Sequence, residues 1–443
     1  MLGWRILREG DYCIQLPSLS DEEEELIHAT EERFKEVTRS QQAQNREESE
    51  ALIKDILVRT AKETGVYIDR EQTEYLGRVA SMHIYGFAFI DLLLDDQEIE
   101  EISILGPKKP AYVYLRKEGW RRVNACFDDE KTIADNINKM SRTLGRHITL
   151  QNPRLDAVLP DGSRLHASLP PISQGEITIR KFRDRPFSPP ELYENKTISA
   201  DGLALLSVLM QCDASIIIAG NTASGKTTTL NALFSFVPMN ERVVITEESP
   251  EINIPHKHQL RLVANKEMGI SLKDLVYDSL RMRPDRIIVG EVRNKEEVEA
   301  LFDVLLAGQA RGSYATLHAQ SVSEAISRLR TFGINDIDIR SIDCIVVQRR
   351  MLLYDPSNRK NTEIRKVVEM AEVCNEPKTV YSEGKIRQCT LIESAAQAFG
   401  FSRKEMFDEL KRRARLITRL GHEYSDFYKE IQKNLYDFDG DEE

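Results

Sequence analysis

The sequence SIIIAGNTASGKTTTL, at residues 215–230, is the most informative part of this chain about its fold. It contains the pattern G-x-x-x-x-G-K-[ST], which is completed by Gly220, Gly225, Lys226 and Thr227. The apolar run IIIA comes immediately before the first glycine. A buried strand, a glycine-containing loop and a helix start, in that order, form the setting that a phosphate-binding loop requires. The sequence therefore predicts a site for a nucleoside triphosphate.

The loop residues have distinct expected roles. The glycines allow successive backbone N–H groups to point inward, which creates an anion-binding nest at the positive end of a helix. Lys226 is expected to reach the β- and γ-phosphates, and Thr227 to offer its hydroxyl to Mg²⁺. A glycine-rich turn that contains a lysine by chance is the structural alternative. We assign nucleotide binding to Gly220, Asn221, Thr222, Ala223, Ser224, Gly225, Lys226, Thr227 and Thr228.

Composition limits the class of protein. A chain of 443 residues is too long for one hydrophobic core and suggests two or three domains. Its net charge of −11 argues against nonspecific coating of nucleic acid. The six cysteines show no C-x-x-C spacing, which favours a reducing cytoplasm over a zinc site or a disulfide framework. No apolar run approaches the roughly 20 residues that cross a bilayer. We therefore expect membrane association only through a partner.

The chain divides into five regions by pattern. Residues 1–84 have helical spacing, and residues 85–183 combine short strands with one helix, which predicts a smaller α+β domain. Residues 184–200 contain three prolines, which favour an extended linker over a helix. Alternating strands and helices in residues 201–375 predict an α/β domain whose largely parallel sheet is covered on both faces. Residues 376–443 predict a helical C-terminal region.

Two features of these last regions are specific enough to test. Strands are expected in the α/β region at residues 215–219, 242–246, 259–263, 286–290, 313–317 and 343–347. A C-terminal helix carries a basic cluster formed by Lys411, Arg412, Arg413, Arg415 and Arg419. A solvated helix face is the main interpretation of this cluster, and docking to an acidic partner or to lipid headgroups is the alternative.

Three further stretches place polar residues at strand ends. Residues 242–249 lead into Glu247 and Glu248, RIIVGEVR delivers Glu291, and SYATLHA places His318 just after another strand. Ligands of open α/β sheets bind at the carboxyl ends of the strands. Such a carboxylate can hold Mg²⁺ through water or polarise the attacking water, and His318 could hydrogen-bond the γ-phosphate. Taken singly, strand-end carboxylates are often helix caps and a lone histidine is usually structural, but their joint order behind a phosphate loop favours a site.

The combination of GNTASGKT, ITEESPE, RMRPDRIIVGEVR and AGQARGSYATLHA resembles the secretion ATPases of type II and type IV systems. That family includes pilus assembly motors and the archaellum motor, and the chain resembles its archaeal-type members most. The four stretches correspond to the family's Walker A, acidic, Walker B and His boxes, and the resemblance covers roughly residues 85–375. Two departures stand out: the acidic box reads Glu247-Glu248 instead of Glu-Asp, and Gln309 replaces a histidine of the His box.

The resemblance implies a fold, a site and an assembly. The fold would be a RecA-like P-loop ATPase domain that follows a PAS-like α+β domain. ATP and Mg²⁺ would be bound with Thr227 and Glu291 on the metal, Glu248 or Glu247 would position the water, and His318 would sense the γ-phosphate. Three arginines at matching positions would complete the site when the N-terminal domain or a neighbouring subunit closes: Arg154, Arg164 and Arg180. The structural alternative for Arg164 and Arg180 is a place on a strand face.

The function implied by the resemblance is a cytoplasmic, homohexameric ATP hydrolase at the inner face of the cytoplasmic membrane. It would act on a polytopic membrane platform protein to assemble or export pilin-like subunits, with no nucleic acid expected as a partner. Two alternatives stay open. A RecA-like ring could instead translocate nucleic acid, although no basic and aromatic interleaving is present. A scaffold could bind ATP for assembly without hydrolysing it.

Overall fold

The computed structural model describes residues 6–8, 11–15, 17–40, 46–84, 86–116, 118–141, 147–149, 151–182, 185–265, 268–308, 310–357, 359–387 and 389–438. The chain forms two compact units, Met1–Arg183 and Asp184–Glu443, and each is described by itself. The phosphate-binding pattern lies in the second unit.

The first unit begins with a short hairpin and a bundle of helices. β1 (Ile6–Arg8) pairs antiparallel with β2 (Asp11–Cys13). The bundle consists of α1 (Asp21–Ser40), α2 (Arg46–Thr64) and α3 (Arg70–Ile84). Leu26, Leu57 and Val79, one from each helix, are buried in a common apolar core. Apolar residues at helical spacing thus hold the bundle together, because each helix buries one stripe against the other two.

A six-stranded sheet forms the rest of the first unit. The strand order is β5-β4-β3-β8-β7-β6, and all neighbouring strands are antiparallel. The strands are β3 (Ile99–Ile104), β4 (Tyr112–Leu115), β5 (Gly119–Arg122), β6 (Arg154–Val158), β7 (Arg164–Ser168) and β8 (Glu176–Arg180). Two helices, α4 (Ile90–Asp95) and α5 (Glu130–Ser141), share its core. The alternating burial in β6 to β8 shows that one face of the sheet faces the core and the other is polar.

The second unit is built on a nine-stranded mixed sheet with the order β11-β10-β12-β13-β9-β14-β15-β16-β17. Its strands are β9 (Ile216–Gly220), β10 (Val243–Glu247), β11 (Gln259–Val263), β12 (Arg286–Val292), β13 (Gly312–Leu317), β14 (Cys344–Asp355), β15 (Lys360–Glu372), β16 (Lys378–Ser382) and β17 (Lys385–Ile386). Neighbours from β11 to β14 are parallel, and those from β14 to β17 are antiparallel. The predicted α/β fold is present, and the parallel part contains the six expected strands.

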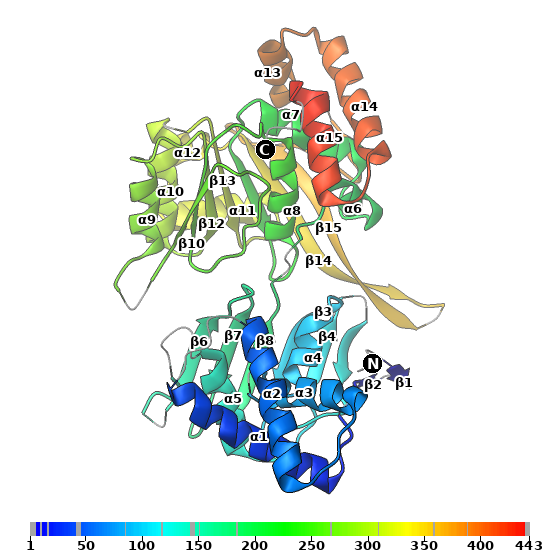
Figure 1. Ribbon diagram of the computed structural model, residues 1–443. Coiled ribbons are helices and arrows are strands. Elements are labelled where there is room, and N and C mark those ends of the chain that lie inside the picture. Colours follow the sequence, from blue (N-terminus) through cyan, green and yellow to red (C-terminus); the bar gives the residue numbers. More distant parts are fainter. Residues whose placement is uncertain are drawn as a thin grey trace. The chain divides into compact units, whose positions relative to one another are not determined.

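Helices cover both faces of this sheet (Figure 1). On one face lie α7 (Ala200–Gln211), α8 (Lys226–Leu233), its 3₁₀ continuation η2 (Phe234–Phe236) and the C-terminal helices. On the other face lie α9 (Leu272–Ser279), α10 (Lys295–Ala307), α11 (Val322–Thr331) and α12 (Asp336–Ile339). In β9, Ile218 joins the first core and Ile217 the second, which explains its unbroken apolar run. Within the described residues, no helix has the length and apolar character that crossing a membrane requires.

The proline-containing segment at residues 184–200 differs from the prediction. It contains α6 (Pro189–Glu194) instead of a wholly extended linker. The Ser188 hydroxyl accepts the N–H of Glu191, whose carboxylate accepts the N–H of Ser188 at 2.8 Å, so a capping box starts the helix. Pro189 and Pro190 occupy its first turn, where an N–H has no intrahelical partner. The extended interpretation was wrong here because proline disfavours a helix interior and not a helix start.

The C-terminal region begins with strands and not with helices. β16 and β17 lie after residue 375 but belong to the nine-stranded sheet, so the expected boundary cuts through that sheet. The helices that follow are α13 (Thr390–Phe399), α14 (Arg403–Arg419) and α15 (Tyr424–Tyr436). Met406 and Phe427 are buried in the same core as Leu206 of α7. These helices therefore complete the core of the second unit.

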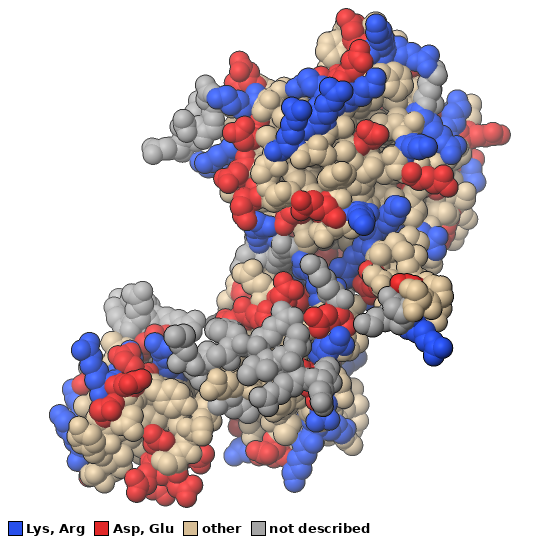
Figure 2. Space-filling view, turned by 90° about the vertical axis from the view of Figure 1, so that its right-hand side faces the viewer, with Lys and Arg blue, Asp and Glu red and all other residues tan. Residues whose placement is uncertain are grey.

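The basic residues of α14 divide between surface and interior. Lys411, Arg415 and Arg419 are exposed, and Figure 2 shows a band of Lys and Arg side chains across the upper part of the second unit, where the C-terminal helices lie. Arg413, which was expected in the same cluster, is only 2% exposed. Its guanidinium bonds to Gln211 of α7 and, at 2.8 Å, to Glu409 of its own helix. Arg413 lies on the apolar stripe of α14, so its long side chain ties two helices together.

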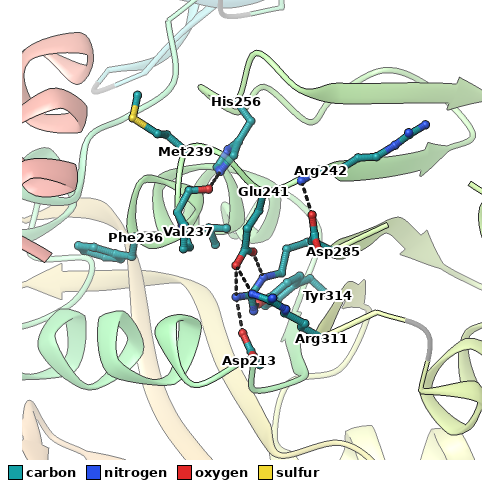
Figure 3. A network of polar contacts seen from close by, with 12 residues as sticks. Asp213, Phe236, Val237, Met239, Glu241, Arg242, His256, Asp285, Arg311 and Tyr314 are labelled. Carbon is teal, nitrogen blue, oxygen red and sulfur yellow. Dashed lines mark hydrogen bonds and ion pairs between the residues drawn. The ribbon is translucent and has the colours of Figure 1, made fainter. Parts of the chain in front are cut away.

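A buried polar network lies at the amino ends of the central strands (Figure 3). Arg286, the first residue of β12, is 1% exposed. Its Nε donates to Glu241 Oε2 at 2.5 Å, its Nη1 donates to the Tyr314 hydroxyl at 3.0 Å, and its Nη2 donates to Asp213. Arg311 Nη1 donates to the other oxygen of Glu241 at 3.1 Å. Two guanidinium groups thus face two carboxylates, which is the arrangement that buried charges require.

Candidate nucleotide-binding site

The phosphate-binding loop runs from the end of β9 to the start of α8. Gly220 ends the strand, residues 221–225 form the loop, and Lys226, Thr227 and Thr228 form the first turn of the helix. Gly225 has φ +91°, and a Cβ added there would lie 2.9 Å from Gln348 Nε2. A Cβ on Gly220 would lie 2.2 Å from the carbonyl oxygen of Gln348. Both glycines of the pattern are therefore required, one by backbone conformation and contact and the other by contact alone.

Lys226 lies inside the loop. Its side chain is 8% exposed, and its Nζ is 3.3 Å from Gly220 O and 3.4 Å from Asn221 O. The same Nζ is 3.7 Å from Glu291 Oε1. The ammonium group is thus buried between carbonyl and carboxylate oxygens at the carboxyl end of β9. A positive charge held there is available to phosphate oxygens that enter the loop.

Glu291 is the centre of the site. Its Oε1 is 2.7 Å from His318 Nε2 as well as 3.7 Å from Lys226 Nζ, and its Oε2 accepts Arg293 Nε at 2.7 Å. Burial alone would raise the pKa of Glu291, but the hydrogen bond and charge of Arg293, with the charges of His318 and Lys226, outweigh it and lower that pKa. The structure therefore brings two predicted residues, Lys226 and His318, to the ionised carboxylate of a third predicted residue, Glu291.

His318 is half-buried beside the phosphate-binding loop. Burial and the charge of Lys226 lower its pKa, and the attraction of Glu291 does not reverse that effect. At neutral pH the imidazole is therefore mostly uncharged. The Nε2 of the ring lies 2.7 Å from Glu291 Oε1. The ring therefore lies against the carboxylate of Glu291.

Arg293 is a site residue that sequence reasoning missed. Its Nη1 donates to Glu248 Oε2 at 2.7 Å while its Nε contacts Glu291, so one guanidinium links the ends of β10 and β12. Arg293 stands two residues after Glu291, and residues two apart in an extended chain point to the same side. That spacing was the available signal. Through Arg293 the structure adds Glu248 to the cluster.

Glu247 occupies a different position from Glu248. Its side chain is buried, and its Oε1 accepts the backbone N–H groups of Glu251 and Ile252 at 2.7 and 2.8 Å. These bonds shape the turn that follows β10. Glu251, a second residue that sequence reasoning missed, accepts the Thr227 hydroxyl at 3.0 Å. The carboxylates of the acidic box therefore have different positions. Glu247 supports the turn, whereas Glu248 and Glu251 face the site.

A family model described as "Type II/IV secretion system protein" matches residues 88–423, which is more than half of the chain. The chain belongs to this family. The resemblance inferred from the four motif stretches is thereby confirmed. In the structure the match begins in the first unit and extends through the whole sheet of the second to α14. We call it the secretion family below.

The share of each relative's length that this chain covers differs among members of the secretion family. The uncharacterized protein MJ0900 of Methanocaldococcus jannaschii is 30% identical over 388 residues, or 82% of this chain and 70% of that protein. The type IV secretion system protein VirB11 of Bartonella quintana is 28% identical over 340 residues, or 61% of this chain and 92% of that protein. The structure of the ATPase DotB from Legionella pneumophila aligns with a TM-score of 0.48 and 18% identity, over 74% of this chain and 87% of that one. The family assignment rests on the sequence matches.

The three arginines implied by the secretion family all lie in the first unit. Arg164 of β7 and Arg180 of β8 are directly opposite in the register of the two strands. Arg154 of β6 is opposite Ser168, at the other end of the hairpin. Arg154 and Arg180 are exposed, and all three side chains point away from the buried residues of their strands. Gln309 of the His box lies outside the described residues.

Replacing Glu247 by glutamine is expected to remove a pH dependence of stability. Burial raises the pKa of Glu247 to about 7, above its ordinary 4.5. Between these values the folded state holds a proton that the unfolded state has released, so stability falls as pH rises from about 4.5 to 7, by on the order of 3 kcal/mol in total. Glutamine accepts the same two N–H groups without a buried charge. Urea midpoints at pH 5 and pH 8 should differ less in E247Q than in the wild type.

An exposed glutamate serves as the control for this experiment. Glu296, in the first turn of α10, is exposed, and Glu296→Gln should keep the wild-type pH dependence. Equal pH profiles for E247Q and the wild type would show that the Glu247 carboxylate is not proton-linked to folding.

Proposed function

We propose that this protein is a Mg²⁺-dependent ATP hydrolase that acts as a secretion or pilus motor. The observation that carries the proposal is the position of Glu291 Oε1, 3.7 Å from Lys226 Nζ and 2.7 Å from His318 Nε2, beside the phosphate-binding loop. A loop alone is compatible with nucleotide binding of any kind. A loop that faces an ionised carboxylate and a strand-end histidine is typical of hydrolysis. Membership of the secretion family supports the same reaction.

The loop residues fit a triphosphate. Ser224 Oγ is buried in the loop and has no hydrogen-bond partner within the described part of the chain, and the two glycines leave no room for a Cβ. In the proposed complex, loop N–H groups and Lys226 hold the phosphates. Thr227, Glu251 and Glu291 offer the oxygen ligands that Mg²⁺ prefers, together with phosphate oxygens and water. The ion would neutralise charge on the phosphates.

We assign the positioning of water to Glu248 and a structural role to Glu247. At the site, the Glu248 carboxylate accepts a hydrogen bond from Arg293. The Glu247 carboxylate instead accepts hydrogen bonds from backbone N–H groups. Arg293 keeps Glu248 and Glu291 together because its guanidinium donates to both side chains. In this scheme His318 responds to the γ-phosphate through its contact with Glu291.

The larger assembly is proposed from the family. Arg154, Arg164 and Arg180 would supply mobile positive charge to the phosphates when the first unit or a neighbouring copy closes over the loop. An arginine that arrives in this way is worth about 10³–10⁵ in rate in related reactions. The second unit would be a RecA-like domain and the first would contain a PAS-like domain. Homohexamers of this chain would work in the cytoplasm, against a polytopic platform protein at the inner face of the membrane.

Glu248→Gln should separate binding from hydrolysis. The amide cannot accept a proton from water, so steady-state phosphate release should fall about 10²-fold or more, while nucleotide affinity stays within a few-fold of the wild type. Glu247→Gln is the matched control, because it makes the same change one residue earlier and should keep turnover within a few-fold. Equal turnover in E248Q and the wild type would contradict the assignment. A wild-type chain that binds ATP but releases no phosphate would favour the assembly scaffold instead.

A further inference from the structure

Gln348 of β14 lies against the phosphate-binding loop although it belongs to none of the four motif stretches. β14 runs parallel to β9, and Gln348 is the register partner of Gly220, the first glycine of the loop. The Gln348 side chain is almost completely buried, with 1% of the residue exposed. A carboxamide in such a place must be satisfied by protein groups, because each unpaired buried polar atom is costly.

Both ends of this carboxamide are bonded to the loop and its helix. Oε1 accepts the Thr229 hydroxyl of α8 at 2.6 Å, and Nε2 donates to the carbonyl oxygen of Ser224 at 2.8 Å. Ser224 precedes Gly225, whose Cα is so close that an added Cβ would meet the same Nε2 at 2.9 Å. One side chain therefore links the last turn of the loop to the first turns of the helix.

The bond to Ser224 also orients the next N–H. A trans peptide unit is planar, and its C=O and N–H point in opposite directions. Because the Ser224 carbonyl is held toward Gln348, the N–H of Gly225 points away from β14. That N–H is one of those that an anion nest of this pattern uses. The hydrogen bond from Gln348 thus selects a peptide orientation that suits phosphate.

A second contact attaches the beginning of the loop to the same strand. Asn221 Nδ2 donates to the carbonyl oxygen of Arg350 at 3.1 Å, and Asn221 Oδ1 accepts the N–H of Arg350 at 2.9 Å. The Asn221 side chain therefore continues the sheet ladder beyond the end of β9. With Gln348 at the far end of the loop, both ends are fixed to β14, and the loop between them has little freedom to change shape.

We propose that Gln348 is a positioning residue that holds the loop in its phosphate-binding shape before nucleotide arrives. The inference rests on the proposed function, since it assumes that the loop binds a nucleotide. Preorganisation of a binding loop increases affinity. A loop that is already ordered does not lose conformational entropy when the ligand binds, so the binding free energy is more favourable. Loss of Gln348 should therefore weaken nucleotide binding far more than it changes the rate of the bound complex.

The test uses full-length protein and a fluorescent N-methylanthraniloyl derivative of ADP as the probe. Gln348→Leu keeps the approximate volume of the side chain and removes both hydrogen bonds. We expect its Kd for the probe to rise about 10- to 100-fold, and KM for ATP to rise similarly while kcat changes less than about threefold. Gln348→Glu keeps an acceptor for the Thr229 hydroxyl but loses the donor to Ser224. It should also weaken binding, and it provides the measurement if the leucine variant does not fold.

Gln432 of α15 offers a matched control. It is also 1% exposed, and its carboxamide bonds to Ser235 O at 2.9 Å, Val237 O at 2.8 Å and Met239 N at 3.0 Å, away from the loop. Gln432→Leu should lower the melting temperature at least as much as Q348L and leave the Kd for the probe within twofold of the wild type. Melting temperatures measured without nucleotide allow the stabilities of Q348L and Q432L to be compared.

The outcomes separate this inference from the function on which it rests. Weaker probe binding in both Gln348 variants, with unchanged binding in Q432L, supports the positioning role. Equal Kd values for Q348L, Q348E and the wild type overturn it, as does an equal loss of binding in Q432L, which would mean general destabilisation. A wild-type chain that does not bind the probe overturns the proposed function and this inference together.

Discussion

ATP turnover is expected to fall by at least about 10²- to 10³-fold when Lys226 is replaced by alanine, because a preorganised charge that faces developing negative charge in a dry site contributes that much. The Lys226 ammonium is buried, lies against loop carbonyls and is 3.7 Å from Glu291 Oε1. Alanine leaves no cation inside the loop for the phosphates. Steady-state phosphate release by purified full-length protein measures the effect, and probe binding should weaken as well.

Lys295→Ala is the control for this substitution. Lys295 is the first residue of α10, its side chain is 59% exposed, and its ion-pair partner is Glu299 of the same helix, at 3.5 Å. An exposed ion pair of this kind contributes little to stability, so turnover should stay within a few-fold of the wild type. Equal ATPase activity in K226A and the wild type would refute the assignment of the loop as the hydrolytic site.

The sequence was sufficient for the central strands and for most of the residues around Glu291. Each of these strands is a short apolar run that ends in a polar motif, and parallel strands bring such ends to one edge. The prediction that Glu248, Glu291 and His318 meet near Lys226 needed only that rule. The rule could not tell which of Glu247 and Glu248 faces the site, because neighbouring residues at a strand end differ only in the direction of the side chain.

The residues that were missed act across elements distant in sequence. Gln348 is 119 positions from Thr229, and Arg293 is 45 positions from Glu248. Neither contact leaves a local pattern of its own, because a glutamine inside a strand or an arginine just after one is compatible with exposure, and only the spacing of Arg293 from Glu291 gave a signal. Arg413 was misplaced for a similar reason: a basic residue on an apolar stripe was assigned to the surface, although a long side chain can carry its charge to a buried partner.

Stability and chemistry lie at opposite ends of the same strands. β12 begins with Arg286 in the buried network and carries Glu291 near its carboxyl end. β13 likewise has Tyr314 near its start and is followed by His318. Strand register therefore connects the network to the site, since a slip of one residue would turn Arg286 out of the core and Glu291 away from the loop. A rigid frame of this kind fixes the distances on which the site depends.

Arg286→Met is expected to lower the free energy of unfolding of the second unit by about 3–5 kcal/mol, because it removes one partner of a buried ion pair and leaves the other uncompensated. Glu241 is 6% exposed and, among the residues that the structure describes, would keep only Arg311, whose own side chain is 60% exposed. The contacts of Arg286 with Tyr314 and Glu241 outweigh its burial and raise its pKa, so it carries its charge at every pH of interest. Urea unfolding followed by intrinsic fluorescence measures the change in midpoint.

The double variant Arg286→Met with Glu241→Leu makes the physical cause testable. If the cost arises from an uncompensated carboxylate, removing Glu241 as well should restore part of the lost stability, and the two single effects should not add. If the cost arises from packing alone, the effects should add. Nucleotide affinity of the folded R286M protein should stay near that of the wild type at low temperature, because the network lies at the amino ends of the strands. A large loss of affinity under those conditions would show that the network also shapes the site.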